Sequence, residues 1–271
     1  MEHLPDIRGR ARDTRARWGK ATLMAASVEL IGAALFQIIA ASTSTPLAVA
    51  STFAAVQYAT KYLSGGHLNP AVSLAAAGSG HMRWSTGGLY ALVQVIGALL
   101  GALLQAFLIP SSHIGHESAG CISPGSDVSS YQLFGWELLL CFLFVMVQYA
   151  ALFVRPGHGD AAPLASAVAL YAILASVGNL TGGSPVNPAR TIASSLVFNC
   201  HTYAAWVYLA GQLAAAALAA CCAVMWHGTG PYYGSNERHE SGEGGGLLAG
   251  LAPGGESGGD RDATFAPCGK L

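Results

Sequence analysis

Six long apolar runs, separated by short polar segments, dominate the chain up to Trp226. Each run could cross the roughly 30 Å hydrocarbon core of a bilayer as an α-helix. The pattern therefore predicts six membrane-spanning helices. Their ranges are 21–41, 46–63, 87–109, 133–154, 162–180 and 203–226.

Two shorter apolar runs, 68–78 and 186–198, lie at matching places after the second and the fifth predicted span. They are too short to cross a bilayer, so each is predicted to enter the membrane as a re-entrant half-helix. Non-helical backbone at membrane depth is tolerated where it lines a water-filled cavity, which indicates a pore. Because each half of the chain has three spans, the second half is inverted relative to the first.

Both short runs begin with the tripeptide Asn-Pro-Ala. The two copies are Asn69-Pro70-Ala71 and Asn187-Pro188-Ala189. Asn is a favoured N-cap residue and Pro is preorganised for the first helical position, so each tripeptide predicts the start of a helix. One copy alone would be weak evidence, but two copies at matching places favour a pair of half-helices entering from opposite faces.

The composition agrees with a membrane protein. Hydrophobic residues make up 52% of the 271 residues and charged residues only 10%, whereas soluble domains carry about a quarter charged residues. The formal net charge of -1 offers no basic face for nucleic acid. No predicted span carries a His/Glu cluster or a nucleophile beside a base, so we expect no enzyme activity, no cofactor and no metal.

The basic residues indicate the orientation, because cytoplasmic loops carry most of the Lys and Arg in membrane proteins. With six spans, all but one of the 13 basic residues fall on one side, and both termini are predicted to be cytosolic. The exception is Arg190, directly after the second tripeptide. The twelve on one side are Arg8, Arg10, Arg12, Arg15, Arg17, Lys20, Lys61, Arg83, Arg155, Arg238, Arg261 and Lys270.

Three parts of the chain are predicted: a cytosolic basic segment at 1–20, a transmembrane channel domain at 21–227, and a cytosolic tail at 228–271. The tail is rich in Gly and charge without an apolar period, so it is predicted to be disordered. Cys121 and Cys200 lie in segments predicted outside the membrane, where a disulfide and two free thiols are both compatible with the sequence.

The segment from Ser64 to Val72, which reads SGGHLNPAV, and the segment Asn187–Arg190 resemble the aquaporin (major intrinsic protein) family. The likeness extends from about Thr22 to Trp226. It implies an all-α membrane protein with six transmembrane helices and two re-entrant half-helices in an inverted repeat. It also implies a water channel that excludes protons and ions, in which Asn69 and Asn187 donate to a central water, and a homotetramer in membrane lipid.

The same resemblance suggests roles for three buried polar residues. It implies that Glu29 and Glu137 accept hydrogen bonds that brace the half-helix loops, and that His67 braces its own loop. Buried carboxyls in membranes can instead mark a proton or ion pathway, and that interpretation stays open at this stage.

A selectivity filter is placed by counting residues back from the two motifs with the family's spacing, which gives Val49, Ala175, Ser184 and Arg190. Water-selective members usually have a large aromatic residue and often a histidine there, so this filter is predicted to be wide and to admit urea or glycerol beside water. In contrast, Thr191 and Ser195 stand where glycerol-conducting members carry an Asp and a basic residue. The two indicators disagree.

The alternatives to a water channel are a dedicated small-solute facilitator and a secondary transporter with an inverted repeat. A transporter would need an intramembrane coupling group, for which Glu29 and Glu137 are the candidates. The doubled Asn-Pro-Ala motif favours the channel.

Overall fold

The computed structural model of the chain describes residues 19–110, 120–154, 157–177, 181, 184–200 and 202–232. Over these residues the chain forms helices and no strand. The predicted segment 1–20 lies almost wholly outside the described residues, and so do residues 233–271 of the predicted tail.

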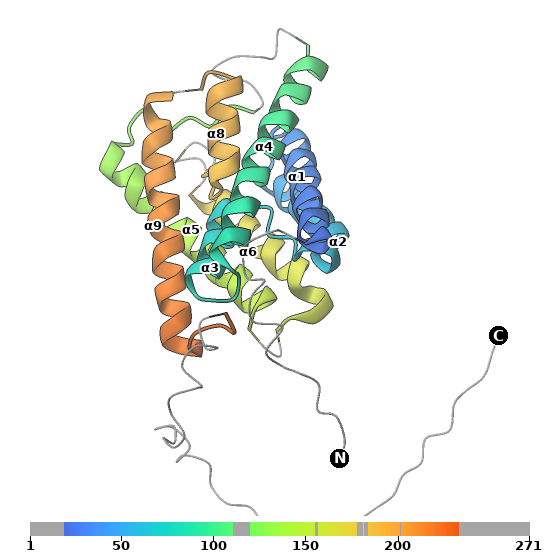
Figure 1. The fold of residues 1–271 in the computed structure, drawn as a ribbon. Helices are drawn as coiled ribbons and strands as arrows, with labels where there is room; N and C mark the ends of the chain where they lie inside the picture. Colours follow the sequence, from blue (N-terminus) through green and yellow to red (C-terminus); the bar gives the residue numbers. More distant parts are fainter. Residues whose placement is uncertain are drawn as a thin grey trace, which may run out of the picture. The chain divides into compact units, whose positions relative to one another are not determined.

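Each predicted run is a helix in the structure (Figure 1). The first half contains α1 (Lys20–Ala40), α2 (Pro46–Ser64), the short α3 (Pro70–Gly78) and α4 (Trp84–Leu108). The second half contains α5 (Ser130–Leu152), the 3-10 turn η3 (Gly159–Ala161), α6 (Ala162–Ser176), the short α8 (Pro188–Val197) and α9 (Thr202–His227).

Five helical segments are long and apolar enough to cross a membrane: α1, α4, α5, η3 with α6, and α9. The sixth long helix, α2, has 19 residues but a more polar composition that includes Gln57, Thr60 and Lys61. Its three buried polar residues, Gln57, Thr60 and Ser64, face the protein interior. The sequence predicts that the fifth span ends at residue 180, whereas in the structure α6 ends at Ser176.

The helix contacts repeat between the two halves. In the first half α1 packs on α2 and α4, and in the second half α5 packs on α6 and α9 in the same way. The halves meet where α2 packs on α6. Each half-helix contacts the last helix of both halves: α3 packs on α4 and α9, and α8 packs on α9 and α4.

Glycines allow the closest of these approaches. A Cβ atom on Gly97 of α4 would lie 2.2 Å from Leu30 O of α1, and one on Gly101 would lie 2.5 Å from Ala34 O. Helix association in membranes depends on such close packing of small residues, because lipid offers no hydrophobic driving force between helices. The absence of a side chain at these two glycines therefore allows α4 to pack directly on the backbone of α1.

Two contacts tie peripheral segments to this helical core. Cys121, after α4, forms a disulfide with Cys200, after α8. After the end of α9, Gly230 N donates to Ser79 O at 2.8 Å and Tyr232 N donates to Gly80 O at 3.0 Å, near the start of α4. The first residues of the predicted tail, 228–232, thus lie against the turn between α3 and α4.

Candidate functional site

Each half-helix begins at its Asn-Pro-Ala motif, as the sequence predicts. Asn69 is the N-cap of α3, and its side-chain oxygen accepts a hydrogen bond from Ala71 N at 2.9 Å. Asn187 is the N-cap of α8, and its side-chain oxygen accepts from Ala189 N at 3.0 Å. The following Pro has no N–H to satisfy, so it fits the first helical position.

The two half-helices meet through their asparagines. Asn69 Nδ2 donates to Val186 O at 2.8 Å, and Asn187 Nδ2 donates to Leu68 O at the same distance. Both side chains are buried, with exposed fractions of 0% and 2%. Residues far apart in the sequence are thereby joined at one point, where the amino termini of α3 and α8 face each other.

The carbonyls that accept these bonds come from strained backbone. Leu68 has a φ of 53° and Val186 a φ of 43°. Positive φ is uncommon for residues other than Gly and unusual for a β-branched residue such as Val. Such conformations persist only where the surrounding structure holds them, and they cluster at functional sites.

Glu29 of α1 holds the first strained loop. Its carboxylate accepts from His67 N at 2.9 Å, Leu68 N at 2.7 Å and Ser64 Oγ at 2.6 Å. Gln94 of α4 donates a further bond, at 2.8 Å. A fully buried carboxylate with this many donors is well compensated for its lost hydration.

Glu137 of α5 does the same for the second loop. It accepts from Val186 N at 2.8 Å and Ser184 Oγ at 2.7 Å, and Gln212 of α9 donates to it at 2.7 Å. The two carboxylates therefore occupy equivalent positions in the inverted repeat. Both lie where the family resemblance implied, against the half-helix loops.

Ser73 and Thr191 also belong to this network, and no sequence motif predicted it. Gln94 Nε2 donates to Ser73 Oγ at 3.1 Å, and Gln212 Nε2 donates to Thr191 Oγ1 at 2.9 Å. The spacing between Asn69 and Asn187 also separates Ser73 from Thr191 and Gln94 from Gln212. That shared spacing is the signal that could have found them.

His67 lies inside the first loop, 2% exposed. Its Nδ1 is 3.0 Å from Ser73 Oγ, and its ring makes edge contacts with Tyr90 and Phe153 at centroid distances of 5.4 Å and 5.3 Å. Its backbone N–H and side chain both make bonds within the braced region, which is the position expected for a loop-supporting residue.

Arg190 lies in the first turn of α8 and is 7% exposed. Its guanidinium carbon is 5.0 Å from the ring centroid of Phe36 on α1, a cation–π distance. Val49 of α2 is buried in the same hydrophobic cluster as Phe36. Arg190 thus lies beside an aromatic ring that no sequence motif singled out.

The other two predicted filter residues are placed differently. Ser184 is fully buried, and its hydroxyl donates to Glu137 rather than lining an opening. Ala175 is exposed and shares a helical stripe with Leu164 and Val168, which are exposed by more than half. Counting back from Asn187 gave its position along the chain but not the rotation of α6, which is set by burial of Leu170 and Leu174 on its inner face. A pore wall and the lipid-facing surface are both exposed in this structure, so the place of Ala175 at the constriction stays a prediction.

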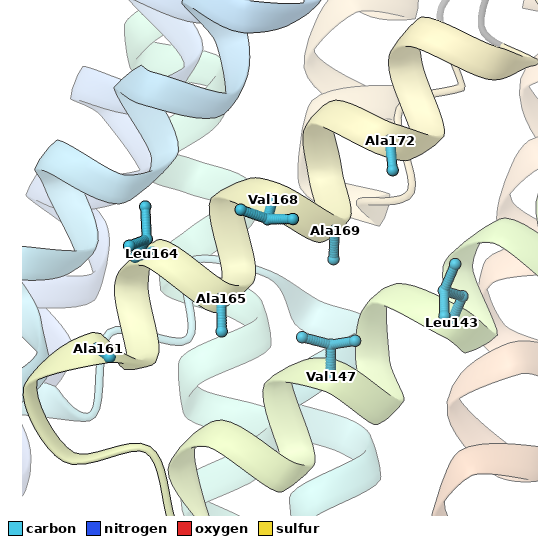
Figure 2. Close-up of a pocket in the computed structure, with 8 residues that line it drawn as sticks. All are labelled: Leu143, Val147, Ala161, Leu164, Ala165, Val168, Ala169 and Ala172. Atoms are coloured by element: carbon cyan, nitrogen blue, oxygen red, sulfur yellow. The ribbon is translucent and has the colours of Figure 1, made fainter.

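A separate apolar groove lies on the outer side of α5 and α6 (Figure 2). It is lined by eight apolar residues, and Leu143 and Val147 of α5 face the side chains of α6 across it. It contains none of the predicted site residues and offers no polar side chain to orient a ligand. Within the described residues, no group of three or more His, Cys, Asp or Glu side chains could hold a metal ion.

Known proteins with a similar sequence belong to a family of membrane channels. The family model "Major intrinsic protein" matches residues 19–222. A probable aquaporin of Oryza sativa subsp. japonica, TIP4-1, is 31% identical over 210 residues, which cover 74% of this chain and 77% of that protein. Aquaporin NIP1-1 of Zea mays is 31% identical over 159 residues, covering 59% of this chain and 54% of that protein.

The fold is also found among solved structures. The X-ray structure of the aquaglyceroporin from Plasmodium falciparum matches with a TM-score of 0.67, covering 76% of this chain and 96% of that one, at 19% sequence identity. This likeness concerns the fold alone. The family model covers most of the chain, and the paired motifs begin two abutting half-helices. The chain is a multi-pass integral membrane protein that belongs to the major intrinsic protein family.

Proposed function

We propose that the protein is a passive membrane channel for water, with small neutral solutes as a second class of substrate, and that it excludes ions and protons. The observation that carries this proposal is the junction of α3 and α8, where Asn69 and Asn187 exchange hydrogen bonds with the opposite loops. A primary amide has two N–H donors. One is used at the junction, and we assign the second to a passing water.

Electrostatics at the junction support the exclusion of cations. Each helix amino terminus carries roughly half a positive charge, and here two such ends face one point. Arg190 adds a full positive charge that does not titrate in the physiological range. Exclusion by half-helix dipoles and an Arg is the mechanism generally assigned to aquaporin-type pores; its application to this chain rests on the arrangement of α3, α8 and Arg190.

Proton exclusion follows from the same geometry. A water held by Asn69 and Asn187 accepts hydrogen bonds from both, so its own hydrogens point toward the two ends of the pore. Water molecules above and below then have opposite orientations. A proton relay needs one continuous orientation along the file, which this arrangement interrupts.

The transporter alternative has less support, because both candidate coupling groups are occupied. Glu29 accepts bonds from two backbone amides of the first loop, and Glu137 accepts one from the second. Protonating either carboxylate would place an O–H where a donor now points and would weaken the bonds that hold the strained backbone. Their geometry is that of fixed supports rather than of groups that bind and release an ion.

Two relatives carry the name aquaporin, and the structural neighbour is named an aquaglyceroporin. These names support water as the first substrate and small neutral solutes, with urea as the smaller candidate, as the second.

The test is stopped-flow light scattering on proteoliposomes that contain the purified protein. A channel gives rapid osmotic shrinkage with a low activation energy and no requirement for a second solute. Asn187→Asp should abolish most of this flux. Water permeability equal to that of empty liposomes, with the folded protein inserted, would reject the proposal.

We further propose that both termini lie in the cytosol, as the positions of Lys61 and Arg83 indicate. The disulfide between Cys121 and Cys200 supports this orientation, because it lies at the opposite ends of the helices and disulfides persist in oxidising compartments. The test is labelling by an impermeant maleimide in intact cells, with Cys221 and Cys222 replaced by Ser. Ser126→Cys should react and His158→Cys should not; the reverse pattern would invert the topology.

We also propose a homotetramer in membrane lipid, on the strength of the family resemblance. The exposed apolar side chains along α5 and α6, among them Leu143 and Leu164, offer a face that lipid or a second copy can cover. The mass of the detergent-solubilised protein, measured by light scattering with the detergent contribution subtracted, checks the stoichiometry.

A further inference from the structure

Phe36 is a bulky side chain beside the charge at the predicted filter. It lies on α1, seven residues after the bracing Glu29, and is 2% exposed. Its ring is 5.0 Å from the guanidinium carbon of Arg190 and 5.2 Å, edge to face, from the ring of Phe53 on α2. The ring is thus held between an aromatic neighbour and the cation.

The other predicted filter residues do not offer a second bulky group. Val49 is a small aliphatic side chain in the same cluster. Ser184 is occupied by its bond to Glu137, and Ala175 is on the exposed stripe of α6. The predicted wide filter counted only these side chains, and it omitted the ring that α1 supplies.

The same turn of α1 also presents a polar atom. Gln37 Nε2 lies 3.5 Å from Ser194 Oγ, one helical turn after Arg190 on α8. Within the described residues, Gln37 Oε1 and Arg190 Nε are buried and have no hydrogen-bond partner. Buried polar atoms of this kind are costly unless water or a ligand satisfies them. Beside the apolar ring there are thus an acceptor and a donor suited to a small polar molecule.

We propose that Phe36 is a specificity-determining residue of the channel: its ring fixes the guanidinium of Arg190 and narrows the passage so that water enters and larger neutral solutes are rejected. This inference rests on the proposed channel function and assigns part of the filter to α1. A cation–π contact restrains the Arg at a fixed distance from the ring. Removing the ring would both widen the passage and release the guanidinium.

The experiment compares water, urea and glycerol permeability in the same proteoliposomes for the parent, Phe36→Leu, Phe36→Ala and Phe36→Tyr. The parent should pass water and largely reject glycerol. Phe36→Leu and Phe36→Ala should raise the glycerol-to-water permeability ratio at least about tenfold, the scale on which the width of a site discriminates between neutral molecules. Phe36→Tyr keeps the ring and should keep the parental ratio.

Phe107→Leu is the matched control, because Phe107 is 84% exposed on α4, away from the junction. This substitution makes the same chemical change without altering the filter, so the glycerol-to-water permeability ratio should equal that of the parent. Melting temperature is measured for every variant, since a residue with a packing role only would lower stability and leave the ratio unchanged.

The outcomes separate this inference from the proposed function. Fast water flux with a glycerol-to-water ratio that is unchanged in both Phe36→Leu and Phe36→Ala overturns the role of Phe36 and leaves the channel intact. If the parent protein already passes glycerol as readily as water, the role of Phe36 is also overturned. Absence of water flux in the parent rejects the channel itself.

Discussion

Asn69 and Asn187 hold each other's loops: each side-chain amide donates to the backbone carbonyl that precedes the other's motif, both at 2.8 Å. The junction therefore depends on both asparagines being donors. Each side-chain oxygen is already used to cap its own half-helix. Every heavy atom of the two amides thus has an assigned structural role.

Replacing either amide by a carboxylate tests this dependence. Asn69→Asp or Asn187→Asp keeps the cap acceptor but puts an oxygen opposite a carbonyl oxygen, so the cross-junction bond is lost. Leaving a buried carbonyl unsatisfied costs about 1–3 kcal/mol. We expect a several-fold loss of water permeability per channel. Asn199→Asp, at an exposed position, should behave like the parent; parental flux in both junction variants would refute the role of the asparagines.

The bracing carboxylates give a second test. Glu29→Gln retains one acceptor oxygen but places an NH2 group opposite the backbone amide of either His67 or Leu68. We expect the free energy of unfolding to fall by about 1–3 kcal/mol, with a matching loss in Glu137→Gln. Asp127→Asn, an exposed change of the same kind, should have little effect.

The same variants distinguish support from proton transfer. Proton permeability, followed with a pH-sensitive dye inside the vesicles, should be low in the parent and should not fall in Glu29→Gln. A proton leak in the parent that disappears in the variant would favour the relay interpretation.

The disulfide should stabilise the folded channel. Cys121 and Cys200 close a loop with a sequence separation of 79 residues, for which chain entropy predicts a stabilisation of about 4 kcal/mol. We expect Cys121→Ser to lower the melting temperature, and reductant to lower that of the parent but not that of the variant. Cys221→Ser, which removes an exposed free thiol, is the control; reductant sensitivity that persists in Cys121→Ser would contradict the assignment.

A pH effect on stability is expected at the turn after α3. His81 Nδ1 lies 2.8 Å from the hydroxyl of Tyr149, and the ring of His227 stacks on that tyrosine at 6.2 Å. Burial lowers the pKa of His81 and the nearby His227 lowers it further, against an opposing hydrogen bond that the His81 ring donates to the backbone of Ser79. The folded protein thus binds this proton more weakly than the unfolded chain.

The direction of this pH effect follows from the linkage between proton binding and folding. Stability from neutral His81 is fully present above the ordinary pKa of 6.5 and is lost as the pH falls below it. Melting temperature should fall between pH 7 and pH 5 in the parent and less in His81→Gln, whose amide does not titrate. His158→Asn changes an exposed histidine and should keep the parental profile. Equal profiles for the parent and His81→Gln would exclude His81 as the sensor.

Much of this architecture could be read from the sequence, because its causes are local or periodic. Apolar length predicts spans, and each predicted run became a helix. Asn followed by Pro predicts a helix start, and Asn69 and Asn187 are indeed N-caps. The placement of Glu29 and Glu137 came from the family resemblance, and their contacts to the loops agree with it.

Only the tertiary structure decided what surrounds Arg190. The rotation of α6 depends on which of its apolar faces packs better against the core, and in a helix that is apolar on all sides the sequence pattern does not distinguish them. This placed Ala175 on the exposed stripe of α6 with Leu164 and Val168. Phe36 is far from Arg190 in the sequence and lies in an ordinary apolar run, so nothing local marks it. Its contact with the guanidinium exists because the packing of α1, α4 and α8 brings the two together, and such long-range packing has no signature in a single sequence.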